Sequence, residues 1–401
     1  MTTEEIRSQF PQLTRTVYGK PLVYLDNAAT SLRPQSVIDR WSEISAHGTA
    51  NLHRAVHHVA AEATEAYENA RTAVAEFIKA PETEEVIFTT GATHSLNLAA
   101  FGIGEAFLKD GDEIIIGEAE HHSNIVPWQM LRNRKGISIK VLPVDENGRL
   151  CIERLESLIS PRTKLVCVAH VSNVLGLVNP VKDISDICRK HGVLLLVDGA
   201  QGVVHQQVDV QELGCDFYAF SGHKMYGAPG TGVLWGRREL LEQMPPMFGG
   251  GEMIETVRWE GSTWAPLPRK FEAGTQNISG TPCFVQAIEI IRSMPKDNET
   301  RDYVYDALQQ IDGLRLFGTT SDRRLKVPVF SFSVEHAHHE DLALILDKMG
   351  IAVRSGQMCA EPLMDRFGVT GMLRASFAPY NTMQEAEYFV SSLRKAIGML
   401  R

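Results

Sequence analysis

The segment Asp216-Phe-Tyr-Ala-Phe-Ser-Gly-His-Lys-Met225 and its continuation to Gly232 are the starting point for interpreting this chain. The apolar run 217–220 predicts a buried strand, and Ser221-Gly222 predicts a tight turn after it. That turn presents Lys224. A lysine just beyond a buried strand is partly desolvated, which favours its neutral and nucleophilic form. A solvated surface lysine is the alternative interpretation, and the rest of the chain has to distinguish the two.

The amino-acid composition limits the classes of protein to which this chain can belong. The chain has 401 residues, of which 44% are hydrophobic and 22% charged, as in a soluble globular protein of about two domains. Its formal charge is −9 and no basic cluster occurs, so neither nucleic acid nor a membrane is an expected partner. The first seven residues contain no apolar run, so no secretory signal is expected. Six cysteines without CxxC spacing argue against a disulfide framework or a zinc site and predict a cytoplasmic location.

Alternating strands and helices predict the fold class. Strands rich in Val, Ile and Leu are expected at 86–89, 113–116, 137–143, 164–169, 193–198, 217–220 and 232–235. Helices between them predict an α/β domain with a mostly parallel, seven-stranded sheet covered on both faces. We expect this large domain to span 21–280, with 249–280 mainly loop. A smaller α+β domain is expected over 281–401, with residues 1–20 packing against it.

Polar residues follow several of these strands. In α/β sheets, ligands bind at the carboxyl ends of the strands. Thr93 opens a helix after one strand, where it could help to bind phosphate or could be an ordinary N-cap. His121 could stack on an aromatic ligand or move protons, whereas metal binding is not expected. Asn173 follows another strand, and Asp198 could pair with a protonated heterocyclic nitrogen or merely cap a turn.

Together with Lys224, these groups describe one ligand, pyridoxal 5'-phosphate. The 26 residues from Asp198 to Lys224 leave room for one crossover between adjacent strands. Cys359 is a further candidate, because it lies in a polar, glycine-containing loop. Arg354 and Arg374 could bind a substrate carboxylate near that loop and favour a thiolate. The other five cysteines are interpreted as small buried hydrophobes.

Nearly the whole chain resembles a group II cysteine desulfurase of the SUF/CSD type, a class-V aminotransferase-like enzyme. The resemblance is carried by Tyr24-Leu-Asp-Asn-Ala-Ala29, Asn51-Leu-His-Arg54, Glu120-His-His-Ser-Asn-Ile-Val-Pro-Trp128, Val171-Ser-Asn-Val-Leu-Gly176, Val197-Asp-Gly-Ala-Gln201, Phe220-Ser-Gly-His-Lys224, Phe271-Glu-Ala-Gly-Thr275, Arg354-Ser-Gly-Gln-Met-Cys359 and Arg374-Ala-Ser-Phe-Ala-Pro-Tyr-Asn381. It implies the fold of type I pyridoxal-phosphate transferases, like that of aspartate aminotransferase.

The resemblance also implies roles for the cofactor-binding residues. Lys224 would form the Schiff base, Asp198 would pair with the ring nitrogen and His121 would stack on the ring. Gln201 would donate a hydrogen bond to the ring oxygen. The phosphate would be held by four residues, one of them from a second subunit: Thr93, Ser221, His223 and the partner subunit's Thr275.

For the substrate, the resemblance implies that Asn173 and Arg374 bind the carboxylate. The entrance would be lined by His53, Arg54 and Arg354. Cys359 would attack the substrate sulfur, become a persulfide and release alanine. One position departs from the family pattern, because Met358 stands where a histidine usually precedes the catalytic cysteine. Polar tuning of the thiol from that position is therefore in doubt.

The implied protein is a homodimer that converts L-cysteine to L-alanine. Its persulfide sulfur would pass to an acceptor protein of the SufE/SufU type for iron–sulfur cluster assembly. Three alternatives stay open at this point. A selenocysteine lyase could act without Cys359, and an aminotransferase or kynureninase-like enzyme would make that cysteine incidental. A scaffold that has lost catalysis is the non-enzyme alternative, against which Lys224, Asp198 and Cys359 argue.

Overall fold

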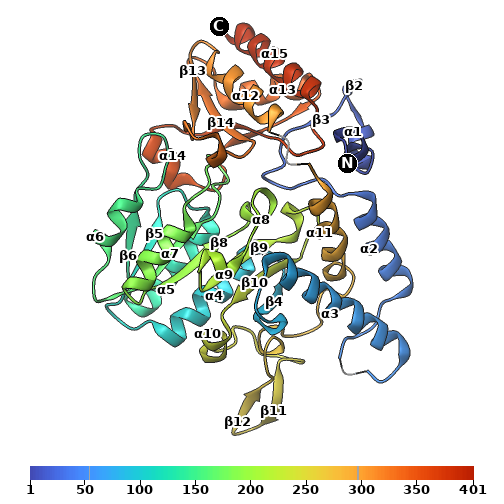
Figure 1. Ribbon diagram of the computed structural model, residues 1–401, viewed down its shortest axis with the longest axis vertical. Coiled ribbons are helices and arrows are strands. Elements are labelled where there is room, and N and C mark those ends of the chain that lie inside the picture. The colour runs from blue at the N-terminus through green and yellow to red at the C-terminus, as the bar shows by residue number, and fades with distance from the viewer. Residues whose placement is uncertain (54, 296–297) are drawn as a thin grey trace.

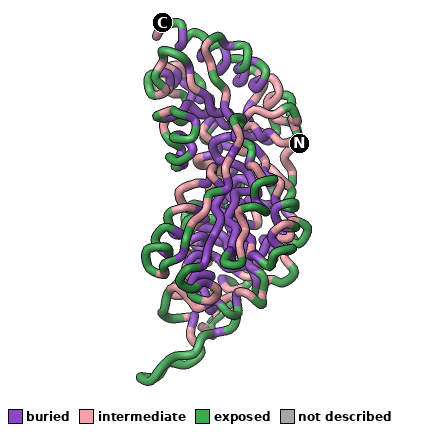
Figure 2. Tube along the Cα trace, turned by 90° about the vertical axis from the view of Figure 1, so that its left-hand side faces the viewer, coloured by how far each residue is buried: buried purple, intermediate pink, exposed green. Residues whose placement is uncertain are grey.

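A computed structural model describes residues 1–53, 55–295 and 298–401. Figure 1 shows a central sheet wrapped by helices, a smaller unit above it that ends at the C-terminus, and a thin hairpin below it. Buried residues run through the middle of the sheet and again through the upper unit (Figure 2). Within the described residues, no helix combines the length and the apolar character needed to cross a membrane.

The large sheet has seven strands in the order β4-β10-β9-β8-β7-β5-β6. Their bounds are β4 (Val86–Thr89), β5 (Glu113–Gly117), β6 (Ser138–Leu142), β7 (Thr163–Ala169), β8 (Leu194–Asp198), β9 (Phe217–Ser221) and β10 (Gly232–Gly236). Only β10 runs antiparallel to its neighbours β4 and β9. The predicted α/β class and the mostly parallel, seven-stranded sheet are therefore confirmed.

Alternate side chains of each strand pack on opposite faces of the sheet. Ile115 belongs to the core on one side, whereas Ile114 and Ile116 belong to the core on the other. Ten helices described around the sheet cover these faces: α2 (Gln35–His47), α3 (His58–Ile78), α4 (Ala92–Phe107), α5 (Val126–Lys135), α6 (Leu155–Leu158), α7 (Val181–Lys190), α8 (Gly202–His205), α9 (Val210–Leu213), α10 (Arg238–Gln243) and α11 (Phe284–Ser293). Two covered faces explain why six of the seven strands are almost fully buried, the edge strand β6 being the exception.

The C-terminal unit is built on a four-stranded antiparallel sheet in the order β13-β14-β17-β16. The strands are β13 (Leu314–Phe317), β14 (Val329–Val334), β16 (Arg354–Gly356) and β17 (Met372–Ser376). The accompanying helices are α12 (Glu299–Gln309), α13 (His339–Lys348), α14 (Glu361–Phe367) and α15 (Met383–Leu400). Sequence reasoning missed β13 and β17, because both are short and each contains an arginine. Every residue of β17 is nevertheless buried.

The N-terminal segment contacts the C-terminal unit. It contains α1 (Thr3–Arg7), β1 (Thr16–Val17) and β2 (Lys20–Pro21). Arg7 forms an ion pair of 2.8 Å with Glu385 of α15. The strand β3 (Val23–Tyr24) follows this segment, and it pairs in parallel with β15 (Ile351–Ala352) rather than joining the large sheet.

The region 249–280, expected to be mainly loop, contains a hairpin of β11 (Ile254–Arg258) and β12 (Gly261–Trp264). It projects from the bottom of the molecule in Figure 1 and is exposed along its length in Figure 2. The interpretation as loop was wrong because the hairpin is held by backbone pairing and buries almost no apolar side chain of its own. Trp259 at its tip is fully exposed.

Candidate functional site

The polar residues singled out in the sequence meet at one edge of the large sheet. Asp198 is the last residue of β8 and Ser221 is the last residue of β9, and the two strands are parallel neighbours. Lys224 lies in the single turn of 3-10 helix, Gly222–Lys224, that follows β9. The crossover predicted between Asp198 and Lys224 is confirmed, since α8 and α9 connect these adjacent strands.

Lys224 and Asp198 are coupled electrostatically. Burial lowers the pKa of Lys224, an effect that Asp198 opposes and that Arg374 reinforces. Burial raises the pKa of Asp198, opposed by Lys224 and by the backbone N–H of Ala200, which donates to Asp198 Oδ1 at 2.9 Å. No hydrogen bond or ion pair engages Lys224 Nζ among the described residues. The site therefore contains an amine with a lowered pKa and a buried carboxylate that still has acceptor capacity.

The imidazole of His121 is held in its neutral state. Burial, and secondly the charge of Lys224, lower the pKa of His121 to about 3. Its Nδ1 accepts a hydrogen bond from the backbone N–H of Ser123 at 3.1 Å, so the ring proton belongs on Nε2. A neutral imidazole of fixed tautomer can stack on an aromatic ring or exchange a proton.

The side chain of Glu120 stabilises the loop that carries His121, a role that sequence reasoning missed. Its side chain accepts hydrogen bonds from Asn124 Nδ2 at 2.6 Å and from the backbone N–H of Ala169 at 2.8 Å. Burial raises the pKa of Glu120 to about 8. The carboxyl group thus ties the loop after β5 to the end of β7.

The expected phosphate-binding residues meet at the start of α4. Ser221 Oγ accepts a hydrogen bond from the backbone N–H of Ala92 at 2.7 Å, and the hydroxyls of Thr93 and Ser123 lie 2.8 Å apart. The N-terminus of a helix with exposed hydroxyls suits a phosphate group. A Cβ atom at Gly232 would meet the backbone of Gly91 at 2.4 Å, so only glycine lets β10 approach this turn.

The two other expected phosphate ligands form no hydrogen bond with this turn in the described chain. His223 Nδ1 lies 3.1 Å from the hydroxyl of Thr30, and burial lowers the pKa of His223 to about 4. Thr275 is exposed on the segment after Glu272 and makes no described contact with the α4 turn. Gln201 Nε2 donates a hydrogen bond to the carbonyl of Ala28 at 2.8 Å.

Arg374 lies buried at the centre of β17. Its Nη1 donates to the carbonyl of Asn173 at 2.9 Å and its Nη2 to Asp26 Oδ1 at 3.2 Å. Arg354 Nη1 approaches the other oxygen of Asp26 at 3.7 Å. Arg374 Nε finds no acceptor among the described residues and is left for a ligand. Asp26 was missed as a site residue, although it lies in one of the motifs that carry the resemblance.

The amide of Asn173 is engaged by the protein. Its Nδ2 donates to the carbonyl of Met358 at 2.9 Å, next to Cys359. Cys359 is the one exposed cysteine of the six, all of which lie in the described part of the chain. Its charge contributes to the pKa of Lys224, so the cysteine lies within electrostatic reach of the amine.

Of the three residues expected at the entrance, Arg354 lies beside Asp26, whereas His53 makes its described contacts elsewhere. Arg54 lies outside the described residues. His53 packs against α3, where its backbone N–H donates to Thr64 Oγ1 at 2.9 Å and its ring lies edge-on to Tyr67. In the single chain, the described contacts of His53 are therefore remote from Lys224.

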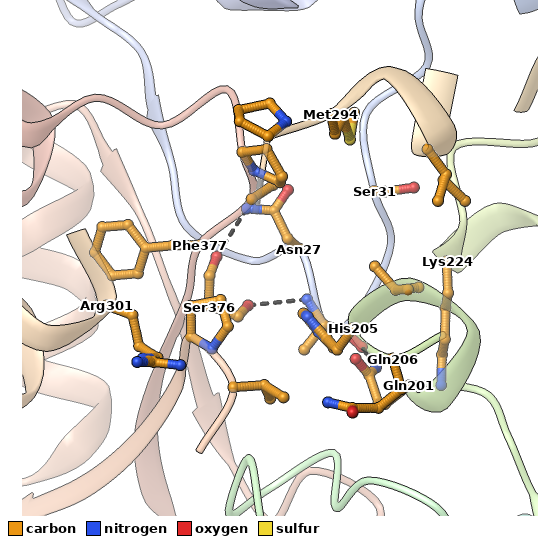
Figure 3. A pocket seen from close by; sticks show the side chains of 18 of the residues that line it. Asn27, Ser31, Gln201, His205, Gln206, Lys224, Met294, Arg301, Ser376 and Phe377 are labelled. Carbon is orange, nitrogen blue, oxygen red and sulfur yellow. Dashed lines mark hydrogen bonds between the residues drawn. The ribbon is translucent and has the colours of Figure 1, made fainter. Parts of the chain in front are cut away.

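A cavity of about 900 Å³ lies between the large sheet and the C-terminal unit. Figure 3 shows Lys224 and Gln201 at one side of it and Ser376 and Phe377 at the other. The carbonyl of Ser376 accepts a hydrogen bond from Asn27 Nδ2 at 2.7 Å, which links the two units. Asp198, His121 and Cys359 do not line it. The cavity therefore borders, but does not contain, the polar residues that follow the ends of β5, β8 and β9, which we call the strand-end group. No cluster of His, Cys, Asp and Glu within the described ranges has the arrangement of a metal site.

Comparisons with known proteins agree with this geometry. Residues 23–389 match the family model of class-V aminotransferases, and the chain belongs to that family. It is 43% identical over 406 aligned positions to a probable cysteine desulfurase of Vibrio cholerae, with complete coverage of both chains. The crystal structure of the cysteine desulfurase CsdA from Escherichia coli, in its S-sulfonic acid form, matches with a TM-score of 0.91 and 37% identity over 100% of both chains. A cysteine desulfurase from Thermococcus onnurineus, solved in its apo form, gives a TM-score of 0.94 and 36% identity, covering 100% of this chain and 99% of the other.

The protein is a pyridoxal-phosphate-dependent enzyme of the cysteine desulfurase type. The residues of the strand-end group fit this cofactor. Lys224 offers an amine that no hydrogen bond from the described residues engages, and Asp198 offers a buried carboxylate that a cationic ring nitrogen would compensate. The α4 turn offers backbone N–H groups and hydroxyls for a phosphate.

Proposed function

We propose that this chain converts L-cysteine to L-alanine and retains the sulfur as a persulfide on Cys359. The proposal is carried by one observation: the only exposed cysteine of the described chain sits in a loop fixed against the strand-end group. The atoms balance, since L-cysteine and the Cys359 thiol give L-alanine and the Cys359 persulfide. A second thiol can then take the outer sulfur and return the Cys359 thiol.

The chain's own residues provide the required proton and charge transfers. Arg374 Nε binds the substrate carboxylate, and the Lys224 amine, whose pKa is lowered by burial, accepts the proton from the substrate Cα. Asp198 would pair with the ring nitrogen of the cofactor. When bound, pyridoxal phosphate supplies the electron sink for the negative charge that this proton transfer creates.

Sulfur transfer requires a thiolate at Cys359. The thiolate attacks the substrate sulfur, the Cβ–S bond breaks, and its electron pair stays with the carbon skeleton. Protonation of that carbon gives alanine. Exposure of Cys359 supports onward transfer to an acceptor protein of the SufE/SufU type, and hence a role in a cytoplasmic SUF pathway of iron–sulfur cluster assembly.

We also propose that the functional unit is a homodimer. An isolated two-stranded hairpin is at best marginally stable, and the hairpin tip exposes Val257 and Trp259. A second copy of the chain would cover this surface. Thr275 is exposed on the same segment of chain, which supports its expected role at the phosphate of the other subunit. His53 contacts Tyr67, whose hydroxyl donates to Glu272, so His53 lies on the side of the Thr275 segment.

The decisive variant is Cys359→Ala, with Cys151→Ala as a matched control at a half-buried cysteine. The purified protein is assayed for alanine from L-cysteine and from L-selenocysteine, with and without a thiol acceptor. We expect Cys359→Ala to keep the absorbance of bound pyridoxal phosphate and to lose alanine formation from L-cysteine, while the control retains both. Full turnover of L-cysteine by Cys359→Ala would exclude the persulfide role. Efficient turnover of L-selenocysteine alone by that variant would identify a selenocysteine lyase activity, and amino transfer to a keto acid would favour an aminotransferase.

A further inference from the structure

The loop that carries Cys359 has an unfavourable backbone conformation. Met358 and Cys359 are consecutive non-glycine residues in the left-handed region, with φ angles of 55° and 56°. Side chains rarely adopt this conformation, and it persists only where surrounding contacts impose it. The contacts that impose it should therefore identify the groups that position the Cys359 thiol.

One residue of the large unit contacts this loop twice. The backbone N–H of His122 donates to the carbonyl of Cys359 at 2.7 Å. The Nε2 atom of His122 accepts a hydrogen bond from the backbone N–H of Glu361 at 3.0 Å. Glu361 is the first residue of α14, and the preceding residue Ala360 provides no side-chain cap. The His122 ring thus satisfies a helix N–H that its own helix leaves unpaired.

Met358 anchors the other end of the loop. Its side chain is buried in the hydrophobic core of the large unit, and its carbonyl accepts the hydrogen bond from Asn173. The apolar residue that stands where a histidine was expected therefore acts through packing. With Met358 buried and the carbonyl of Cys359 bonded, the thiol has little freedom to move.

The base of this contact is rigid. His122 begins the 3-10 helix His122–Asn124, and its carbonyl accepts the backbone N–H of Ile125 at 3.0 Å. The hydrogen bonds of Glu120 to Asn124 and Ala169 fix that helix to the sheet. His122 therefore fixes the Cys359 loop, which belongs to the C-terminal unit, relative to the large sheet.

We propose that His122 is a positioning residue for Cys359, holding the strained loop over the strand-end group through its backbone N–H and its ring. This inference rests on the proposed role of Cys359 in taking the substrate sulfur. Removing the ring would release the start of α14 and let the loop relax away from the site. The substrate and cofactor contacts of Arg374, Lys224 and Asp198 would stay in place. A misplaced nucleophile slows the chemical step without weakening substrate binding.

The test compares His122→Ala with His122→Gln, whose side-chain oxygen can still accept from Glu361. His58→Ala is the control, because His58 lies exposed on α3. In the holoenzyme, we expect His122→Ala to lower kcat for alanine formation by about tenfold or more with KM for L-cysteine within about twofold. The absorbance of bound pyridoxal phosphate should not change. His122→Gln should recover most of kcat, and His58→Ala should behave as the unsubstituted protein.

Hydrogen exchange of the peptide covering 355–365 provides a readout that does not depend on catalysis. Exchange of this peptide should be faster in His122→Ala and return towards the original rate in His122→Gln. Unchanged exchange and kcat in His122→Ala would overturn the proposal, as would a loss of kcat that accompanies loss of the cofactor absorbance. Should Cys359→Ala retain full turnover, the proposed function fails, while the exchange rates still report whether His122 fixes the loop.

Discussion

The buried ion pair between Arg71 and Glu272 provides a quantitative test of how the Thr275 segment is held. Both side chains are 2% exposed, and the guanidinium bonds the carboxylate in a bidentate manner at 2.7 and 2.9 Å. Glu272 Oε1 also accepts the backbone N–H of Phe88 at 2.7 Å, and the Arg71 guanidinium lies 4.6 Å from the Phe88 ring centroid. We expect Glu272→Gln to be strongly destabilising, because it leaves the buried Arg71 charge with the partly exposed carboxylate of Glu68 as its remaining ion-pair partner among the described residues.

Removing one partner of a buried ion pair typically costs about 3–5 kcal/mol. Unfolding entropy is about 2.1 cal/mol/K per residue, or roughly 0.8 kcal/mol/K for a chain of this length if it unfolds as one unit. The expected decrease in Tm is therefore about 4–6 °C. The measurement is a thermal scan at fixed rate, fixed protein concentration and saturating pyridoxal phosphate, since bound ligand shifts the apparent stability.

The control is Lys182→Met on α7, which removes an ion pair with Asp186 in which both side chains are about half exposed. An exposed pair contributes about 0–1 kcal/mol, so its Tm should change by no more than about 1 °C. The double variant Arg71→Met with Glu272→Gln should lose less than the sum of the single variants, because no uncompensated charge remains. If Glu272→Gln lowers Tm no more than Lys182→Met does, the reasoning about the buried charge is wrong.

Three further outcomes are expected. Burial raises the folded-state pKa of Glu120 to about 8, above its ordinary value of 4.5, so native stability should fall as pH rises between these values. Glu120→Gln should flatten that dependence in urea unfolding at pH 5, 7 and 9, and equal slopes in both proteins would contradict the assignment. Asp198→Asn should retain cofactor but slow alanine formation by about a hundredfold or more, since the ring nitrogen loses its counter-ion; a rate within a few-fold would refute this role. Trp259→Glu should shift the mass in light scattering towards the monomer, and an unchanged mass would remove the hairpin from the proposed dimer interface.

The seven strands of the large sheet could be predicted because each is rich in apolar residues and alternates with a predicted helix or turn. The strand β17 could not, since Met372-Leu-Arg-Ala-Ser376 contains a central arginine, and burial of a charge is favourable only with partners distant in the sequence. Those partners are Asp26 and the carbonyl of Asn173. The hairpin β11–β12 was not predicted for a different reason. Its side chains are exposed, so its sequence lacks the alternation of apolar and polar residues that a half-buried strand shows.

The residues of the candidate site that could be recognised from the sequence differ physically from those that could not. Lys224 and Asp198 were recognised from the sequence because each places a charge at or near a buried strand, which is costly without a ligand. Arg374 was recognised as a possible carboxylate ligand near the Cys359 loop. All three retain hydrogen-bonding capacity in the structure. His122 and Glu120 were overlooked because their hydrogen bonds are satisfied within the protein by residues far apart in the chain.

The contacts of Asn173 could not be predicted from its neighbours in the sequence. The resemblance implies that Asn173 binds the substrate carboxylate. In the structure its Nδ2 donates to the carbonyl of Met358, and its own carbonyl accepts from Arg374. One residue thus links the guanidinium proposed to bind substrate with the strained loop that presents Cys359. If the substrate carboxylate drew the amide of Asn173 away from Met358, one support of that loop would be lost on binding. An Asn173→Ala variant should therefore show faster hydrogen exchange at 355–365 even without substrate, whereas an unchanged rate would leave His122 and the buried Met358 side chain as the contacts that matter.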